Sequence, residues 1–198
     1  QNKRIRQSFM ALCFKPMSAI DLARACKDIG LVAMEGISSK DYPAVRELGL
    51  NISLVGSHGF KQGPCDPQHR DMCIAKLKAS IDLAAEVKCP SVITFTGMRV
   101  AGLTDAQQDA NCVDVWKAVI KHAEARKINL VLEHLNSRDD THPMKGHPGY
   151  YGDHVDHCVD LIRKVDSPNM KLLFDVYHVQ IMDGDVIRRI GQYKDVIG

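Results

Sequence analysis

Two acidic residues, each placed directly after an apolar run, are the strongest sign of chemistry in this sequence. Leu130–Leu132 precede Glu133, and Leu172–Phe174 precede Asp175. This pattern is expected where a buried parallel strand reaches the open end of a sheet and presents a carboxylate to a ligand. A single carboxylate in this position is as readily a helix N-cap or one half of a loop ion pair. Two instances together favour a site, and two such carboxylates could hold a divalent cation.

Polar residues close to the two acids extend the candidate site. His178 lies three positions after the second acid, where it could bind substrate or close the end of a strand. Asn136 and Arg138 lie in the loop after the first acid and are candidates for substrate binding, although both residue types also occur as ordinary turn residues. His134 follows the first acid directly and would point to the opposite face of a strand, so we expect it to pack or to support a ligand.

Two long loops could cover a site at this end of the sheet. Residues 57–64 are rich in glycine and contain His58, a further candidate for substrate binding, and residues 141–151 end in two tyrosines. Both loops are long enough to act as lids whose aromatic side chains exclude water, and the alternative is a solvated loop. Glu35 ends another apolar run and could form a hydrogen bond at the same mouth or a structural ion pair.

Histidines and cysteines give little support to a zinc site. His142, His147, His154 and His157 follow one another closely, but their spacing places only the last two on one face of a helix, where exposed histidines are common. Seven cysteines are scattered through the chain without a CxxC pair, which favours reduced thiols over a disulfide framework or a zinc knuckle.

Short apolar runs alternate with amphipathic stretches along the chain, which predicts a parallel sheet with helical crossovers. Apolar periodicity and end signals predict helices from Ser18 to Ile29, from Pro67 to Val87 and from Asp105 to Arg126. The predicted strands are Gln7–Phe14, Leu31–Glu35, Asn51–Gly56, Ser91–Thr96, Asn129–Glu133 and Lys171–Asp175, with Asp195–Gly198 as the start of a seventh.

A closed (β/α)8 TIM barrel explains this alternation better than an open, doubly wound sheet. The first turn lacks the glycine-rich phosphate motif of a dinucleotide-binding sheet, and no GxGxxG or P-loop occurs elsewhere. Candidate residues follow several strands, as in a barrel whose active site collects from all strand ends. A complete barrel takes about 250 residues, so we expect one C-terminally truncated barrel domain over residues 1–198, with about six βα units and the start of a seventh strand.

Composition limits the classes of partner. The net charge is +2 and the basic residues are dispersed, so we expect no nucleic-acid partner. No apolar run is long enough to span a membrane, and the first four residues do not resemble a signal peptide. Reduced thiols favour the cytoplasm; because the chain begins with Gln rather than Met, export after removal of a leader is the alternative. The sequence does not reveal oligomeric state, and a homo-oligomer stays open.

The two acidic motifs carry a family resemblance that covers the whole chain. Residues 131–139 read VLEHLNSRD, residues 174–180 read FDVYHVQ, and residues 34–36 read MEG. Together they resemble the xylose-isomerase-like barrel superfamily, and within it the hydroxypyruvate isomerase family of sugar isomerases and epimerases. The resemblance implies a divalent-metal-dependent isomerase or epimerase that acts on a small sugar or other hydroxycarbonyl compound.

The resemblance also implies roles for individual residues. Glu133 matches a metal-binding glutamate that also transfers a proton, Asp175 matches a second metal ligand, and His178 matches a residue that contacts a substrate oxygen beside the metal. The family's remaining ligands, after the seventh and eighth strands, have no counterpart before Gly198. Proton abstraction next to a carbonyl leaves an enediolate, whose charge a hard cation stabilises. Carboxylates with one imidazole suit Mg²⁺ or Mn²⁺.

Two other functions remain to be weighed. A non-catalytic sugar- or metal-binding barrel would retain the fold without the second catalytic glutamate. An enzyme like endonuclease IV, from another branch of the superfamily, would need histidines after the third and fourth strands. His58 could supply the first, but Phe95–Met98 at the end of the fourth strand contains none. The dispersed charge also offers no track for DNA phosphates, so this reading is the less favoured.

Overall fold

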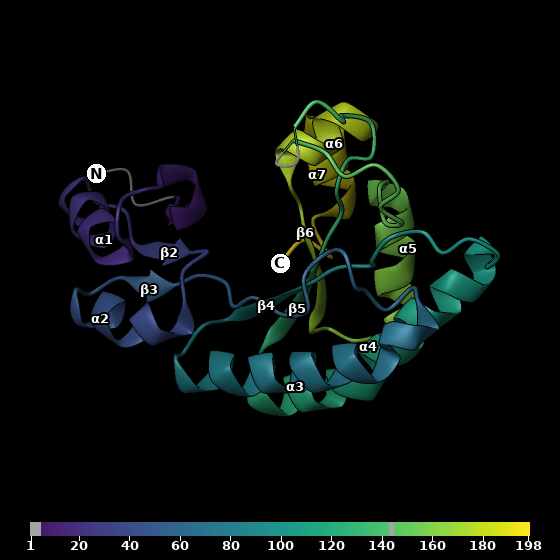
Figure 1. Cartoon of the computed structure of the whole chain (residues 1–198), viewed down its shortest axis with the longest axis horizontal. Helices are drawn as coiled ribbons and strands as arrows, with labels where there is room; N and C mark the ends of the chain where they lie inside the picture. Colours follow the sequence, from purple (N-terminus) through teal and green to yellow (C-terminus); the bar gives the residue numbers. More distant parts are fainter. Residues whose placement is uncertain (1–4, 143–144) are drawn as a thin grey trace.

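The computed structural model describes residues 5–142 and 145–198, which form a curved wall of six short parallel strands (Figure 1). Val55 pairs in parallel with Val92, so the second of two three-stranded sheets continues from the first. Strands in sequence order with parallel pairing are the arrangement of a (β/α) barrel wall. The strands are β1 (Ser8–Met10), β2 (Ala33–Glu35), β3 (Asn51–Ile52), β4 (Ser91–Thr94), β5 (Asn129–Glu133) and β6 (Met170–Leu173).

Helices follow the strands and lie in an arc around the outside of the wall (Figure 1). Neighbouring helices contact one another, α1 with α2, α3 with α4 and α4 with α5. The α-helices are α1 (Ala19–Asp28), α2 (Tyr42–Glu47), α3 (Arg70–Glu86), α4 (Asp105–Arg126), α5 (Val155–Val165), α6 (Val176–Met182) and α7 (Val186–Tyr193). The short 3₁₀ helices of the described residues are η1 (Ala11–Phe14), η2 (Ser39–Asp41) and η3 (Pro67–His69).

Local end signals explain where the best-predicted helices begin. The Ser18 hydroxyl accepts the N–H of Asp21 at 3.1 Å and so caps α1. Thr104 and Gln107 form a complete capping box at the start of α4. Both helices confirm the sequence prediction, and α4 has the predicted bounds.

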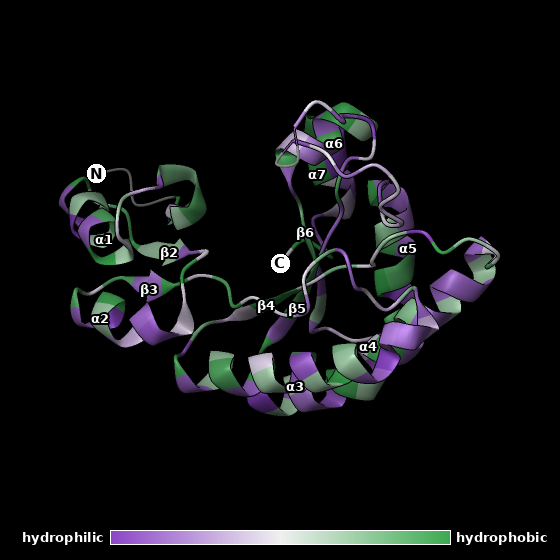
Figure 2. Ribbon diagram, viewed as in Figure 1, coloured by the Kyte–Doolittle hydropathy of each residue, from purple (hydrophilic) through white to green (hydrophobic). Residues whose placement is uncertain are grey.

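The core runs along the wall between strands and helices. Trp116 of α4 is fully buried, and its indole N–H donates to the Thr94 hydroxyl at 3.0 Å. Hydrophobic and hydrophilic residues alternate along α3 in Figure 2, as expected for a helix with one face on the core. Among the described helices, none combines the length and the apolar character needed to cross a bilayer.

The first strand is shorter than predicted. Strand character was expected from Gln7 to Phe14, but β1 ends at Met10 and η1 follows. Only Phe9 in this apolar run is buried, whereas Leu12 and Phe14 are exposed. The prediction was wrong because apolar residues at an exposed edge give the same sequence pattern as a buried strand.

Within the described residues the barrel wall is open, as predicted. β1 pairs with β2 on one side and has no hydrogen-bonded strand on the other. At the opposite end, Ile197 forms a single parallel bridge with Leu172, which begins the predicted seventh strand. Met10 at the end of β1 is exposed, as is Met17 after η1.

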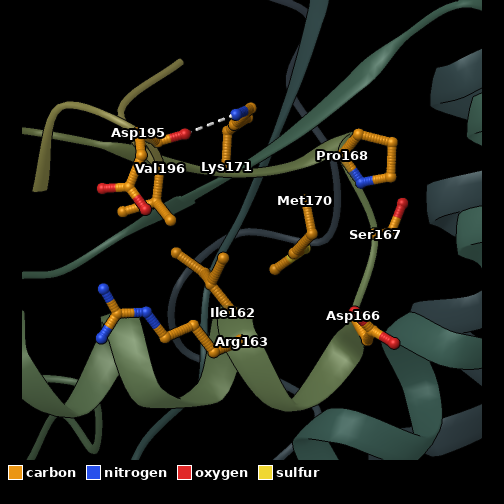
Figure 3. Close-up of a pocket in the computed structure, with 9 residues that line it drawn as sticks. All are labelled: Ile162, Arg163, Asp166, Ser167, Pro168, Met170, Lys171, Asp195 and Val196. Carbon is orange, nitrogen blue, oxygen red and sulfur yellow. Dashed lines mark hydrogen bonds between the residues drawn. The ribbon is translucent and has the colours of Figure 1, made fainter.

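A cavity of about 400 Å³ lies away from the candidate residues (Figure 3). Its lining joins the C-terminal end of α5 to the start of β6, and Lys171 donates there to the Asp195 carbonyl at 2.8 Å. This is the N-terminal end of the parallel strands. Active sites of (β/α) barrels lie at the opposite, C-terminal end, so we assign no catalytic role to this cavity.

His58 is held inside the barrel mouth by a hydrogen-bonded chain. Its Nδ1 lies 2.8 Å from the Gly59 carbonyl and 3.1 Å from the Gln62 carbonyl, so this nitrogen carries the proton. Its Nε2 then accepts from the Thr94 hydroxyl at 3.0 Å, and that oxygen accepts from Trp116. Burial lowers the pKa of His58 to about 4.

This pKa predicts a stability change below neutral pH. The unfolded chain binds a proton near pH 6.5, whereas folded His58 resists protonation until about pH 4. The free energy of unfolding should therefore fall as pH drops through this window, by a total of about 3 kcal/mol from His58. Urea unfolding of the wild type and His58→Gln at several pH values measures this contribution. Equal pH slopes for the two proteins would contradict it.

Candidate metal centre

Parallel pairing brings the two predicted acids to the same end of neighbouring strands. Glu133 is the last residue of β5 and lies opposite Leu173, the last residue of β6. Asp175 follows two residues later, where the chain turns into α6. The predicted placement of Glu133 and Asp175 at adjacent strand ends is confirmed.

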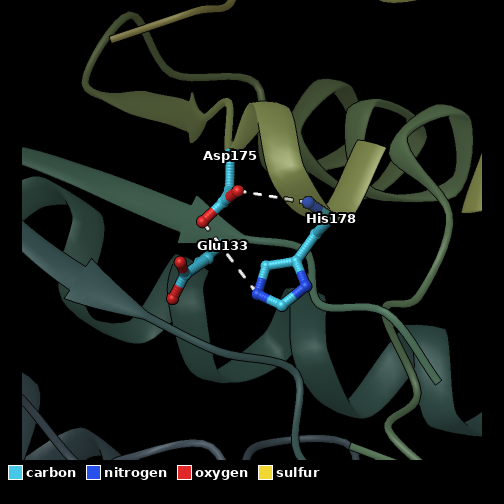
Figure 4. Close-up of side chains that lie close together, drawn as sticks. All are labelled: Glu133, Asp175 and His178. Carbon is cyan, nitrogen blue, oxygen red and sulfur yellow. Dashed lines mark hydrogen bonds and ion pairs between the residues drawn. The ribbon is translucent and has the colours of Figure 1, made fainter. Parts of the chain in front are cut away.

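Glu133, Asp175 and His178 form one cluster in Figure 4. One potential ligand atom from each of the three lies within 4.8 Å of the others. Among the described residues, these three side chains are the group of His, Cys, Asp or Glu residues that lie close enough together to hold a metal ion.

Asp175 is both a helix cap and a member of the cluster. Its Oδ1 accepts the backbone N–H groups of Tyr177 at 2.8 Å and His178 at 3.1 Å, which caps α6. Its Oδ2 faces His178 Nε2 at 4.0 Å. The two readings of this acid in the sequence are therefore compatible, because capping fixes one oxygen and turns the other towards the cluster.

Glu133 is a half-buried carboxylate without a hydrogen-bond donor among the described residues. Burial raises its pKa to about 8, with further contributions from the nearby charges of Asp175 and Glu35. Glu35 accepts a hydrogen bond from the Ser53 hydroxyl at 2.9 Å, which is one of the two roles predicted for it from the sequence. Burial raises the pKa of Glu35 as well. Among the described residues, the charged groups that act on Glu133 are thus other carboxylates, which raise its pKa.

Asn136 sets the orientation and tautomer of His178. The backbone N–H of Asn136 lies 3.0 Å from His178 Nδ1, and the Asn136 side-chain nitrogen lies 2.8 Å from the same atom. A backbone N–H can only donate, so Nδ1 must present a lone pair and neutral His178 carries its proton on Nε2. Burial lowers the pKa of His178, which favours this neutral form.

These donors fit a hard divalent cation. A buried carboxylate with no donor, next to a second carboxylate with a free oxygen, is stabilised when a cation neutralises the pair. Because Nε2 of neutral His178 carries the proton, this nitrogen is suited to donate a hydrogen bond to a bound oxygen rather than to ligate the ion. Glu133 and Asp175 would then be the protein ligands supplied by this part of the wall.

Other predicted residues lie outside the cluster. Arg138 is exposed and donates to the Ile181 carbonyl at 3.1 Å. Both ring nitrogens of His58 have partners within the chain, so its hydrogen bonds favour a role in fixing its loop. The substrate-binding roles assigned to Arg138, Asn136 and His58 stay predictions. His134 is fully buried, and its expected packing or supporting role stays a prediction.

The second predicted lid loop is only partly a surface loop. Pro143 and Met144 lie outside the described residues. Tyr150 and Tyr151 at its end are fully buried, so their rings do not cover the mouth. The His147 ring instead contacts Phe60 of the first loop in a tilted arrangement, with ring centroids 4.3 Å apart, and lies 6.2 Å from the His178 ring, so the two loops meet beside the cluster.

The discounted zinc arrangement does not form among the described residues. His154 pairs with Asp183 at 2.7 Å, and His157 pairs with Asp109 at 2.7 Å. The cysteines of the described chain are free thiols, and most are buried.

Sequence reasoning missed two functions: Asn136 as the residue that orients His178, and Tyr150, whose hydroxyl donates to the Glu133 carbonyl. Neither contact leaves a sequence pattern, because each depends on packing between separate segments.

The chain belongs to the xylose isomerase-like TIM barrel family. A family model with this description matches residues 24–198. The fold described above agrees with this assignment.

Known proteins resemble the chain over most of its length. A Drosophila melanogaster protein named "Putative hydroxypyruvate isomerase" is 28% identical over 175 residues, which cover 83% of this chain and 62% of that protein. A 2-oxo-tetronate isomerase of Pectobacterium atrosepticum is 25% identical over 207 residues, which cover 96% of this chain and 74% of that protein. This chain therefore spans less than two thirds of the length of the Drosophila relative.

Solved structures show the same fold. The crystal structure of an AP endonuclease of family 2 from Brucella melitensis superposes with a TM-score of 0.84 at 18% identity. The superposition covers 98% of this chain and 77% of that chain. At this identity the likeness defines the fold alone.

The tautomer of His178 gives a direct prediction. Its ring should carry the proton on Nε2 and show a non-protonated Nδ1 at neutral pH, because Asn136 donates to Nδ1. Ring ¹⁵N chemical shifts of labelled protein distinguish the two nitrogens. A proton on Nδ1 would contradict the hydrogen-bond assignment and would leave Nε2 free to ligate a metal ion.

Proposed function

We propose that this protein is a divalent-metal-dependent isomerase or epimerase of small hydroxycarbonyl compounds. The observation that carries the proposal is the pair of carboxylates, Glu133 and Asp175, at adjacent strand ends with His178 beside them. A cation held by these carboxylates, Mg²⁺ or Mn²⁺, would supply Lewis acidity to two substrate oxygens.

The protein side chains have distinct tasks in this proposal. Glu133 takes the proton from the carbon next to the carbonyl, which leaves an enediolate. In an isomerase reaction the resulting glutamic acid returns that proton to the neighbouring carbon, while the hydroxyl proton passes to the former carbonyl oxygen. Burial raises the pKa of Glu133 to about 8 in the structure, and a bound cation opposes that rise by favouring the carboxylate. Asp175 would hold the ion with the oxygen that does not cap α6. His178 donates its Nε2–H to the substrate oxygen that gains charge.

The names of the relatives support the substrate class. Hydroxypyruvate and 2-oxo-tetronate, named in the two relatives, are both small hydroxycarbonyl compounds with a carboxylate. A small substrate also suits the barrel mouth, since Phe60 and His147 meet there. A substrate of this class at this site is the proposal, and the particular compound is left open.

A sugar- or metal-binding barrel without catalysis is the second candidate. It would bind the cation and the substrate but would not exchange the substrate proton. An endonuclease like endonuclease IV is disfavoured, because His58 is hydrogen-bonded through both ring nitrogens within the chain. Proton exchange therefore distinguishes the enzyme from the binding protein.

Glu133→Gln tests the proposed base. The amide keeps an oxygen ligand but loses the charge and the basic lone pair, so exchange of the substrate α-proton with solvent should fall by about 100-fold or more. Exchange is measured by NMR in deuterated buffer with the complete natural protein and saturating Mn²⁺. Full exchange in Glu133→Gln would show that Glu133 is not the base and would favour another catalytic residue.

Asp175→Asn tests the proposed ligand without removing the helix cap. Asparagine caps a helix as well as aspartate does, so the variant should fold normally while Mn²⁺ affinity falls by about tenfold or more. Excess Mn²⁺ should partly restore activity. Asp66→Asn is the matched control, because Asp66 caps η3 through the N–H of Gln68 at 2.9 Å and lies outside the cluster. Equal Mn²⁺ affinities in the two variants would exclude Asp175 as a ligand.

A further inference from the structure

We infer that Tyr150 is a positioning residue whose phenol hydroxyl is inserted between the ends of β4 and β5 and fixes the main chain of Glu133. This inference rests on the proposed function, because it matters for the metal centre that Glu133 helps to form. The hydroxyl accepts the Thr96 N–H at 3.0 Å and donates to the Glu133 carbonyl at 2.8 Å. Tyr150 and Thr96 are both fully buried.

The register of the two strands shows what the hydroxyl replaces. Asn129 N–H donates to the Pro90 carbonyl, so residues 129, 131 and 133 of β5 direct their peptide groups towards β4. Thr94 lies opposite Leu132. If the hydrogen bonds between β4 and β5 continued for two more residues, the Thr96 N–H would donate directly to the Glu133 carbonyl. The Tyr150 hydroxyl takes the place of this direct hydrogen bond, because it accepts from Thr96 and donates to Glu133. It therefore separates the ends of β4 and β5 at Glu133.

A tightly packed segment, residues 149–152, positions this hydroxyl, and we call this segment the strap. Residues 149–152 run antiparallel to residues 97–99: Arg99 N–H donates to the Gly149 carbonyl at 2.8 Å, and Tyr151 N–H donates to the Gly97 carbonyl at 2.9 Å. Gly152 N–H donates to the Thr96 hydroxyl at 2.8 Å. A Cβ at Gly152 would lie 2.7 Å from the Thr96 methyl carbon, so the strap can sit this close only with glycine.

The neighbouring tyrosine anchors the strap on its outer side. Tyr151 donates to Asp109 at 2.6 Å and lies 2.9 Å from the Asp105 carbonyl, both on α4. Asp109 also accepts from His157 and Lys164 of α5, each at 2.7 Å. The two adjacent tyrosines therefore have different structural roles. Tyr150 contacts the strand end that carries Glu133, and Tyr151 fixes the strap to two outer helices.

This pair provides a matched experiment. Tyr150→Phe and Tyr151→Phe each remove one buried, hydrogen-bonded hydroxyl from the same strap, so both should lower the thermal unfolding temperature. Only Tyr150→Phe should disturb the metal centre, because Thr96 N–H and the Glu133 carbonyl must then form a direct hydrogen bond or stay unpaired. We expect Mn²⁺ affinity, measured by titration calorimetry with Mn²⁺ alone, to fall by about tenfold in Tyr150→Phe and to stay within about twofold in Tyr151→Phe.

The outcomes separate the inference from the proposed function. Equal Mn²⁺ affinities in the two variants, with saturable binding in the wild type, would overturn the positioning role and leave the metal centre intact. No saturable Mn²⁺ binding in the wild type would overturn both.

A measurement on the wild type covers the case in which Tyr150→Phe does not fold. Coupling between two sites is reciprocal, so Mg²⁺ binding at Glu133 should slow hydrogen exchange of the Thr96 amide, which donates to Tyr150. Val92 in the body of β4 is the control amide. Slowing at Thr96 beyond that at Val92 supports the inference, and equal changes at the two amides overturn it.

Discussion

Burial of neighbouring carboxyl groups in the barrel mouth is the constraint on which the rest of the site depends. Burial raises the pKa of Glu133, the nearby charges of Asp175 and Glu35 raise it further, and no hydrogen-bond donor among the described residues opposes this rise. Ionising these carboxyl groups destabilises the protein when no cation is bound, and a bound cation offsets this cost. Parallel register creates the arrangement, because Glu133 lies opposite the last residue of β6 and the chain then turns at Asp175.

The groups around this pair restrict its geometry rather than neutralise it. The N–H groups at the start of α6 hold one oxygen of Asp175, Asn136 holds one nitrogen of His178, and Tyr150 holds the main chain of Glu133. Each member of the cluster is thus fixed by a hydrogen bond through an atom other than the one it offers to the cluster. Their remaining atoms converge, which is what a preorganised site for a cation and a substrate requires.

Sequence patterns predicted the barrel, the bounds of α4 and the two acids, because apolar periodicity and strand ends are local signals. They did not predict that β1 ends at Met10, since an exposed apolar edge reads like a strand. They also missed the pairing of Asn136 with His178 and the hydrogen bond from Tyr150 to Glu133. These contacts join segments far apart in the sequence, so their existence depends on how the loops pack and not on any local spacing.

Anomalous diffraction from crystals grown with Mn²⁺ tests the central claim most directly, because it locates the ion without assuming an activity. We expect one strong peak within about 2.5 Å of carboxylate oxygens of both Glu133 and Asp175, with the Nε2 of His178 outside the coordination sphere. A peak elsewhere in the molecule, or one bound through His178 Nε2 without Glu133, would contradict the account.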